Sequence, residues 1–103
     1  MDFVGLDKKI AVMSIVHLLI KGKVQGVFYR ASAKEVADRL HISGWIKNTR
    51  EGHVEALASG SEEDLRRFIE WCRKGPERAV VSDLIVSEAA QTQITGFSIL
   101  KGF

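Results

Sequence analysis

The sequence predicts a single α+β domain in which strands and helices follow one another in the order βαββαβ, with a short strand added at the end. Three observations lead to this prediction. The chain has 103 residues, which suits one domain with one core. Two segments have apolar residues at helical spacing, and the segments around them have the branched or alternating residues typical of strands. The composition, 46% hydrophobic and 27% charged, is that of a globular protein.

The first strand is expected over residues 14 to 21, where the chain reads Ser-Ile-Val-His-Leu-Leu-Ile-Lys. Apolar residues fall on both of its alternating faces, which is typical of a strand inside a sheet, and we expect it to be a central strand. Residues 1 to 13 show no clear period, so we expect an N-terminal extension or mobile tail before a domain that spans residues 14 to 103. Met13 is a candidate natural start.

A glycine loop over Gly22 to Phe28 breaks this strand and opens the first helix. After the turn at residues 43 and 44, two short strands are expected over residues 45 to 48 and 53 to 58, joined by a hairpin turn. The helix between the loop and the turn is predicted from apolar residues at helical spacing, which are Ala33, Val36, Ala37 and Leu40.

The second half of the chain repeats this pattern. Ser61 and Asp64 have the spacing of a capping box and start a second helix, which Gly75 and Pro76 end. Its apolar stripe consists of Leu65, Phe68, Ile69 and Cys72. Strands are expected over residues 80 to 86 and 96 to 100. The whole order predicts a ferredoxin-like sandwich, with a four- to five-stranded antiparallel sheet and two helices on one face.

Charge and cysteine content exclude several classes of function. The net charge is +2, and the basic residues are scattered among acidic ones, so the sequence favours at most a small anionic ligand and not nucleic acid. The apolar run over residues 10 to 20 ends at Lys21 and is shorter than the ~20 residues that span a bilayer, so no membrane segment is expected. The lone cysteine, Cys72, forms no disulfide within the chain, which indicates a reducing, cytoplasmic location.

The strongest chemical signal is the loop that ends at Arg30. Glycines let its backbone approach a ligand closely, and the start of the following helix leaves several N–H donors unsatisfied, so the loop is a candidate anion cradle. Arg30, in the first helical turn, has a planar fork of donors that can hold two phosphate oxygens. The alternative is an ordinary strand-to-helix turn with a solvated arginine. The loop lacks the Lys-Ser or Lys-Thr of a nucleotide-binding P-loop.

Two long motifs then resemble those of the acylphosphatase family. The first is Gly-Lys-Val-Gln-Gly-Val-Phe-Tyr-Arg over residues 22 to 30. The second is Gly-Trp-Ile-Lys-Asn-Thr-Arg-Glu-Gly-His-Val over residues 44 to 54. They occur in the family's order, and the resemblance extends from about Ser14 to Leu100.

The resemblance implies a hydrolase that cleaves acyl phosphates with an attacking water and uses neither a cofactor nor a metal. Arg30 would bind the phosphoryl group, and Asn48 would orient the water. Backbone N–H groups would complete the phosphate site, from Gly22, Lys23, Val24, Gln25, Gly26, Val27 and Phe28. Inorganic phosphate and sulfate would compete with the substrate, and we expect a monomer.

Other reactive residues have structural interpretations. Cys72 lies on the apolar stripe of its helix and is expected to pack as a small hydrophobe. The histidines, His17, His41 and His53, lack metal-ligand spacing and are expected to be structural or solvated.

Two rival functions stay open at this point. One is an RNA-recognition module, which shares the element order but requires an aromatic-rich strand that residues 53 to 58 lack. The other is a non-catalytic acylphosphatase-like domain that binds phosphate, of the kind found at the start of larger carbamoyl-transfer proteins. We expect the small, single-domain enzyme instead.

Overall fold

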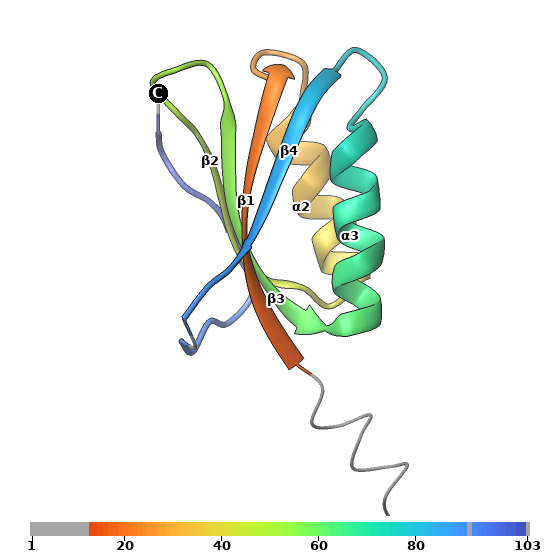
Figure 1. Cartoon of the computed structure of the whole chain (residues 1–103), viewed down its shortest axis with the longest axis vertical. Coiled ribbons are helices and arrows are strands. Elements are labelled where there is room, and N and C mark those ends of the chain that lie inside the picture. The colour runs from red at the N-terminus through yellow and green to blue at the C-terminus, as the bar shows by residue number, and fades with distance from the viewer. Residues whose placement is uncertain (1–12, 91, 103) are drawn as a thin grey trace, which may run out of the picture.

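The structure, a computed structural model, describes residues 13–90 and 92–102. It contains five strands and two helices in the expected order (Figure 1). Apart from Met13, the expected N-terminal extension lies outside the described residues. The elements are β1 (Met13–Lys23), α2 (Tyr29–Arg39), β2 (Ser43–Asn48), β3 (Val54–Ser61), α3 (Glu62–Lys74), β4 (Val80–Glu88) and β5 (Phe97–Ile99).

The strands form one sheet in the order β4-β1-β3-β2-β5, and both helices lie on one side of it (Figure 1). This is the predicted ferredoxin-like α+β fold. The sheet is mixed rather than fully antiparallel, because β5 pairs parallel with β2. The chain leaves β4 and turns back to the opposite edge, so β5 runs against β4 and therefore along β2. The expected central strand, β1, is an interior strand, and β3 is the middle one.

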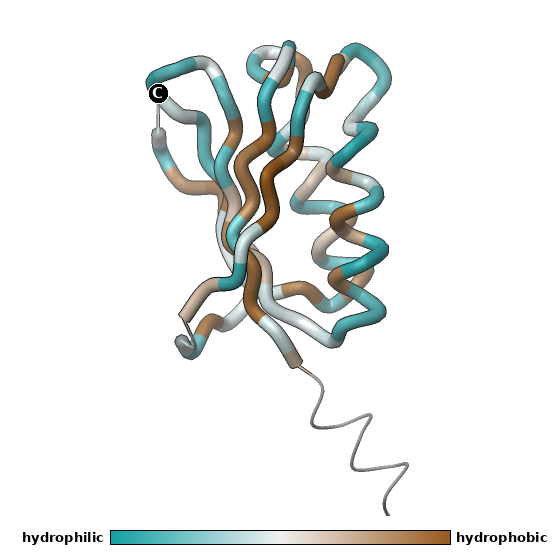
Figure 2. Tube along the Cα trace, viewed as in Figure 1, coloured by the Kyte–Doolittle hydropathy of each residue, from teal (hydrophilic) through white to brown (hydrophobic). Residues whose placement is uncertain are grey.

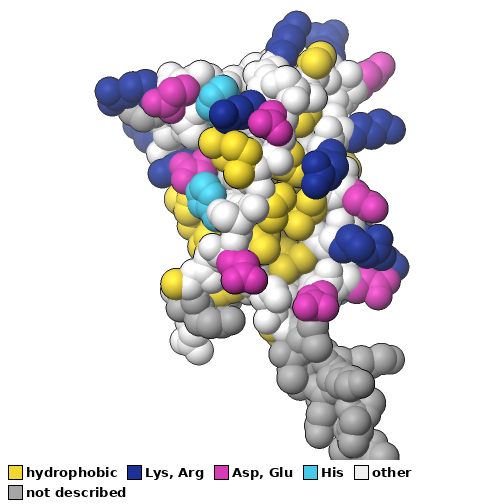
Figure 3. Space-filling model, viewed as in Figure 1, with side chains coloured by type: hydrophobic (Ala, Val, Ile, Leu, Met, Phe, Trp, Pro, Cys, Tyr) yellow, Lys and Arg dark blue, Asp and Glu magenta, His cyan; other side chains and the backbone are white. Residues whose placement is uncertain are grey.

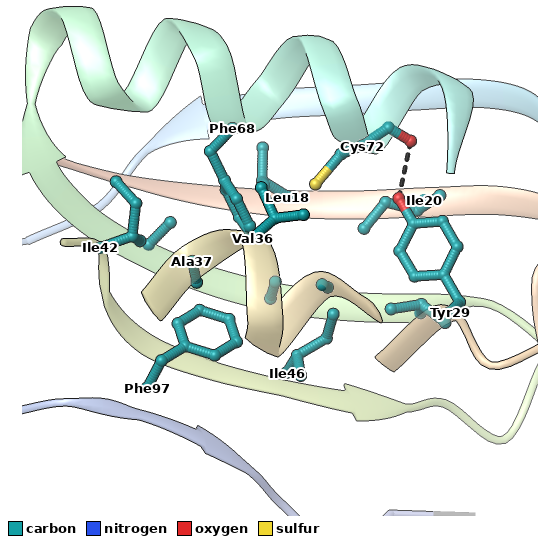
Figure 4. Packing of buried hydrophobic residues seen from close by; sticks show 14 of the residues in the cluster. Leu18, Ile20, Tyr29, Val36, Ala37, Ile42, Ile46, Phe68, Cys72 and Phe97 are labelled. Carbon is teal, nitrogen blue, oxygen red and sulfur yellow. Dashed lines mark hydrogen bonds between the residues drawn. The ribbon is translucent and has the colours of Figure 1, made fainter. Parts of the chain in front are cut away.

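The hydrophobic core fills the space between the helices and the sheet (Figure 4). Along β3 every second residue is buried, so Val54, Ala56 and Ala58 share the helix-covered face as predicted. The predicted stripes of both helices contribute to the same core layer, where the ring centres of Phe68 on α3 and Phe97 on β5 lie 5.8 Å apart (Figure 4). Figure 2 shows long hydrophobic stretches on β1 and β4 and a mainly hydrophilic α3.

The predicted signals at the ends of α3 are confirmed. The side chain of Ser61 accepts a hydrogen bond of 3.1 Å from the backbone N–H of Asp64, which caps the first turn. At the other end Gly75 has φ 71° and ψ −173°, an extended conformation with positive φ that only glycine adopts without strain. These caps fix the length of the helix that packs behind the candidate site.

Near its end β1 is irregular but continues through Gly22 and Lys23, which were predicted to lie in the loop. The pairing of β1 with β4 shifts between Lys21 and Gly22, and Gly22 has φ 126°. A Cβ atom there would lie 2.1 Å from the carbonyl oxygen of Val80, so only glycine fits. This close approach directs the chain into the loop before α2.

The surface carries charges of both signs. Figure 3 shows lysine, arginine, aspartate and glutamate side chains interspersed over one face, with hydrophobic side chains gathered in its middle. Among the residues that the structure describes, neither helix is long and apolar enough to cross a bilayer.

Candidate active site

The loop between β1 and α2 has the backbone geometry of an anion cradle. Gly26 and Phe28 both adopt left-handed conformations, with φ values of 75° and 65°, whereas Val27 between them does not. Such alternation turns successive backbone N–H groups toward one concavity, which is how backbone nests bind anions. The candidate cradle of residues 22 to 28 therefore has, at its C-terminal end, two residues of positive φ that are separated by Val27.

The first turn of α2 leaves its donors available. Phe28 occupies the N-cap position but its side chain makes no capping hydrogen bond, so the first-turn N–H groups have no side-chain cap. The first turn also contains no acidic residue, and Arg30 follows within it. The free N–H groups, the positive end of the helix dipole and Arg30 together favour a negatively charged ligand.

These features line one cavity of about 350 Å³. Arg30 contributes to it together with three residues of the expected cradle, Val24, Gly26 and Phe28. Tyr29, Ala31 and Ile99 complete the lining. The structure therefore brings Arg30 and the second half of the loop together in one concave site.

The floor of this cavity is anchored in the core. Tyr29 is 1% exposed and donates a hydrogen bond of 2.6 Å to the backbone carbonyl of Cys72 on α3 (Figure 4). Its ring also packs against Trp71 with the ring centres 5.3 Å apart. Burial raises the pKa of the Tyr29 hydroxyl above its ordinary range and the pKa of the Cys72 thiol to about 12. Cys72 is thus a protonated core residue, as predicted, and not a nucleophile.

Asn48 lies on the neighbouring strand. It is the last residue of β2, pairs with Val54 on β3, and is only 8% exposed. Asn48 lies two positions after the buried Ile46, and residues two apart in a strand share a face, so its side chain is on the helix-covered face of the sheet. Asn48 is not among the residues that line the cavity around Arg30.

Gln25 connects the loop to the strand end that carries Asn48. Its side-chain amide donates hydrogen bonds to the backbone carbonyls of Thr49, at 2.9 Å, and His53, at 2.8 Å. The hairpin is closed by the backbone N–H of Thr49, which donates to the carbonyl of His53. Sequence reasoning counted Gln25 only for its backbone and missed this link, because no spacing rule relates positions 25 and 53. It also missed Ile99, which lines the cavity from the last strand.

His17 behaves as expected of a structural residue. His17 bonds through Nε2 to Glu55 across the sheet at 2.6 Å. Within residues 13–90 and 92–102, no three histidine, cysteine, aspartate or glutamate side chains lie close enough together to hold a metal ion.

The fold defines a small two-layer α+β domain in which Arg30 and the loop before α2 line one cavity, and comparison with known proteins shows its family. The acylphosphatase family model matches residues 16–99. An acylphosphatase of Marinobacter nauticus is 48% identical over 77 residues, which are 75% of this chain and 84% of the relative. The structure of an acylphosphatase from Coxiella burnetii superimposes with a TM-score of 0.84 at 34% identity, covering 89% of this chain and 97% of that one. The chain belongs to the acylphosphatase family.

A larger protein contains a similar fold. The structure of full-length HypF, solved with phosphate and nucleotide bound, matches with a TM-score of 0.80 and 25% identity, over 87% of this chain but only 12% of HypF. The curated acylphosphatases, by contrast, are covered over most of their length. The comparisons therefore favour the hydrolase over a non-catalytic phosphate- or RNA-binding module.

Proposed function

We propose that this protein hydrolyses the carboxyl-phosphate anhydride bond of acyl phosphates, with Arg30 and the loop of residues 22 to 28 as the phosphoryl site and Asn48 as the residue that orients water. The observation that carries the proposal is the cavity that Arg30 shares with the left-handed residues Gly26 and Phe28. A tetrahedral anion fits such a site because backbone donors and a guanidinium fork can hold separate oxygens.

The reaction requires little more than this site. The water oxygen attacks phosphorus as the bond to the acyl oxygen breaks, and the electron pair leaves on a carboxylate, which is stable without a proton. Arg30 and the loop donors neutralise charge on the phosphoryl oxygens and hold the group for in-line attack. The proton of the water passes to a phosphate oxygen, because an asparagine amide is too weak a base to take it.

Asn48 is suited to hold the water through its side-chain carbonyl. The side chain is buried at the end of β2, and the Gln25 link connects the following residue, Thr49, to the phosphate loop. A fixed position matters more here than basicity, since a misplaced water loses the alignment that in-line attack needs.

The proposal extends to the setting of the enzyme. We expect a cytoplasmic monomer, because the lone cysteine is buried in the core and surface charges of both signs are interspersed. Inorganic phosphate and sulfate are expected to bind the same site and compete with substrate. Gel filtration together with inhibition by millimolar phosphate tests both points.

Replacing Arg30 by lysine is the sharpest test of the site. Arg30→Lys keeps the charge but replaces a bidentate fork with a hydrated point charge, so both a charge-assisted hydrogen bond and the alignment are lost. At ~1.5 to 3 kcal/mol for such a bond, plus misalignment, kcat/KM for acetyl phosphate should fall at least about a hundredfold. Arg39→Lys, an exposed change in the last turn of the same helix, is the matched control and should leave kcat/KM unchanged. Near-normal turnover by Arg30→Lys would remove Arg30 from the phosphoryl site.

A further inference from the structure

The cavity around Arg30 extends beyond the groups that a phosphoryl group needs. Arg30 and three cradle residues belong to the proposed phosphoryl site, whereas Ala31 and Ile99, which also line the cavity, lie outside the loop. Ile99 comes from β5, the short strand added after the βαββαβ order. An acyl phosphate has a second part, the acyl group, that must lie next to the phosphoryl site.

Two large apolar side chains at this cavity remain in contact with water. Phe28 is 76% exposed and Ile99 is 41% exposed. Phe28 also holds a left-handed backbone, which is unusual for a bulky residue and typical of ligand-binding positions. A side chain that is neither buried in the core nor relaxed in its backbone gains apolar contact only when a ligand covers it.

The position of Ile99 follows from the sheet register. Ile99 pairs with Ile46 on the parallel neighbour β2, and Ile46 is fully buried on the helix-covered face. Residues in register on adjacent strands share a face, so Ile99 points to the side of the sheet on which α2 lies. It therefore lines the cavity together with Arg30 and the small side chain of Ala31.

The charge of the lining limits which acyl groups fit. Of the described residues that line the cavity, Arg30 is the only charged one, and the proposed function uses it for the phosphoryl group. A carboxylate or second phosphate on the acyl group would meet Phe28 and Ile99 rather than a second cation. An uncharged aromatic or branched alkyl group would instead cover both apolar side chains.

We propose that Phe28 and Ile99 form an acyl subsite that selects acyl phosphates with an uncharged aromatic or branched alkyl acyl group over those with a short or anionic one. The inference rests on the proposed function, in which Arg30 and the loop hold the phosphoryl group of the same molecule. The side chains of Phe28 and Ile99 then determine specificity by contacting the acyl group, whereas the backbone N–H of Phe28 remains part of the phosphoryl site.

Kinetics with three substrates test this subsite. The wild-type protein should hydrolyse benzoyl phosphate with a kcat/KM at least about tenfold above those of acetyl phosphate and succinyl phosphate, because each buried carbon adds roughly a fourfold preference. Ile99→Thr keeps a β-branched strand residue but makes it polar. It should lower kcat/KM for benzoyl phosphate roughly five- to tenfold and leave acetyl phosphate and inhibition by inorganic phosphate nearly unchanged.

A matched control and a second variant complete the experiment. Ile85→Thr makes the same change on β4 at a residue of similar exposure, 44%, that does not line the cavity, and it should alter no substrate preference. Phe28→Asn removes the ring, and asparagine tolerates the left-handed backbone. The ratio of benzoyl phosphate to acetyl phosphate turnover should therefore be lower in this variant than in the wild-type protein.

The outcomes separate the two proposals. The subsite would be overturned if the wild-type protein hydrolysed acetyl phosphate normally but neither Ile99→Thr nor Phe28→Asn changed the ratio of kcat/KM for benzoyl phosphate to that for acetyl phosphate. The proposed function would then remain intact. A wild-type protein that hydrolyses none of the three substrates would overturn the proposed function and the subsite together.

Discussion

At the scale of single residues, Asn48 is unusual in being a buried polar side chain at a strand end. Among the residues that the structure describes, Asn48 is the only polar or charged one that is buried. Burial of an amide costs free energy unless it is hydrogen-bonded, so such a residue in a core is retained for a specific geometry. In the proposed function, that geometry is the one that orients the attacking water.

Replacing Asn48 by alanine should separate catalysis from binding. We expect kcat to fall on the order of a hundredfold, as for loss of one positioned amide in other active sites, while the inhibition constant of inorganic phosphate stays within about twofold. Unfolding by urea should show a loss of about 1 to 3 kcal/mol from the buried hydrogen-bonding groups left behind. If Asn48→Ala instead binds phosphate poorly, Asn48 is part of the anion-binding site and does not act by orienting the water.

The buried Cys72 thiol should make the folded protein less stable at alkaline pH. Burial raises its pKa from 9.0 to about 12, and burial also raises the pKa of Tyr29. As the pH rises, these groups lose their protons in the unfolded chain before they do so in the folded protein. The free energy of unfolding should therefore be highest below about pH 9 and decrease as the pH rises toward 12.

Urea unfolding at pH 7.5 and pH 10 measures this effect. Cys72→Ala should be less stable at both pH values, because it leaves a cavity, but its stability should change less between them. Equal stability of the wild-type protein at the two pH values would contradict the sign of these shifts. The folded protein should also resist a thiol reagent at pH 8 until it is unfolded.

At the scale of elements, the junction of β1 and β4 positions the start of the phosphate loop. Gly22 combines a left-handed φ of 126° with a backbone so close to Val80 that no side chain fits. The edge strand and the loop are therefore coupled at one residue, and a change there should disturb both the sheet and the anion site.

Gly22→Ala tests this coupling. We expect a loss of roughly 2 to 5 kcal/mol, from backbone strain and from the clash with β4, together with weaker inhibition by phosphate. Gly52→Ala is the control, because Gly52 has φ 92° but nothing within 4 Å of an added Cβ, so only the strain of about 1 to 2 kcal/mol should appear. Chemical denaturation gives the first quantity and steady-state inhibition the second. Equal losses in the two variants would show that the approach to Val80 is not limiting.

At the scale of the whole molecule, the candidate site is tied to both halves of the fold. Tyr29 joins the start of α2 to the end of α3, and Gln25 joins the loop to the hairpin between β2 and β3. A ligand in the loop is therefore bound by a structure that exists only when both halves are folded together.

Phosphate should consequently stabilise the whole domain. At about one hundred times its dissociation constant, inorganic phosphate should add about 2.7 kcal/mol to the free energy of unfolding. For a domain of this size that raises Tm by roughly 10 to 20 °C. Potassium chloride at matched ionic strength should give little change, and Arg30→Lys should lose most of the phosphate effect. A phosphate effect no larger than that of chloride would mean that the folded protein has no specific anion site.

Much of the fold could be predicted because its signals are local. The helical stripe from Leu65 to Cys72, the Ser61 cap and the alternation from Val54 to Ala58 each depend on residues a few positions apart. The loop motif likewise indicated the anion site, because glycine spacing and the following arginine lie within nine residues. The sequence by itself thus determined the element order, the two-layer class and the neighbourhood of Arg30.

The tertiary structure decided what depends on partners distant in the chain. The parallel pairing of β5 with β2, the placement of Ile99 beside the start of α2 and the Gln25 hydrogen bonds to residues 49 and 53 all join segments that no local period relates. The burial of Asn48 also follows from the face of β2 that the helices cover. Periodicity specifies which side of an element is apolar, but only the packed sheet, through its register and strand order, selects the neighbours that this side meets.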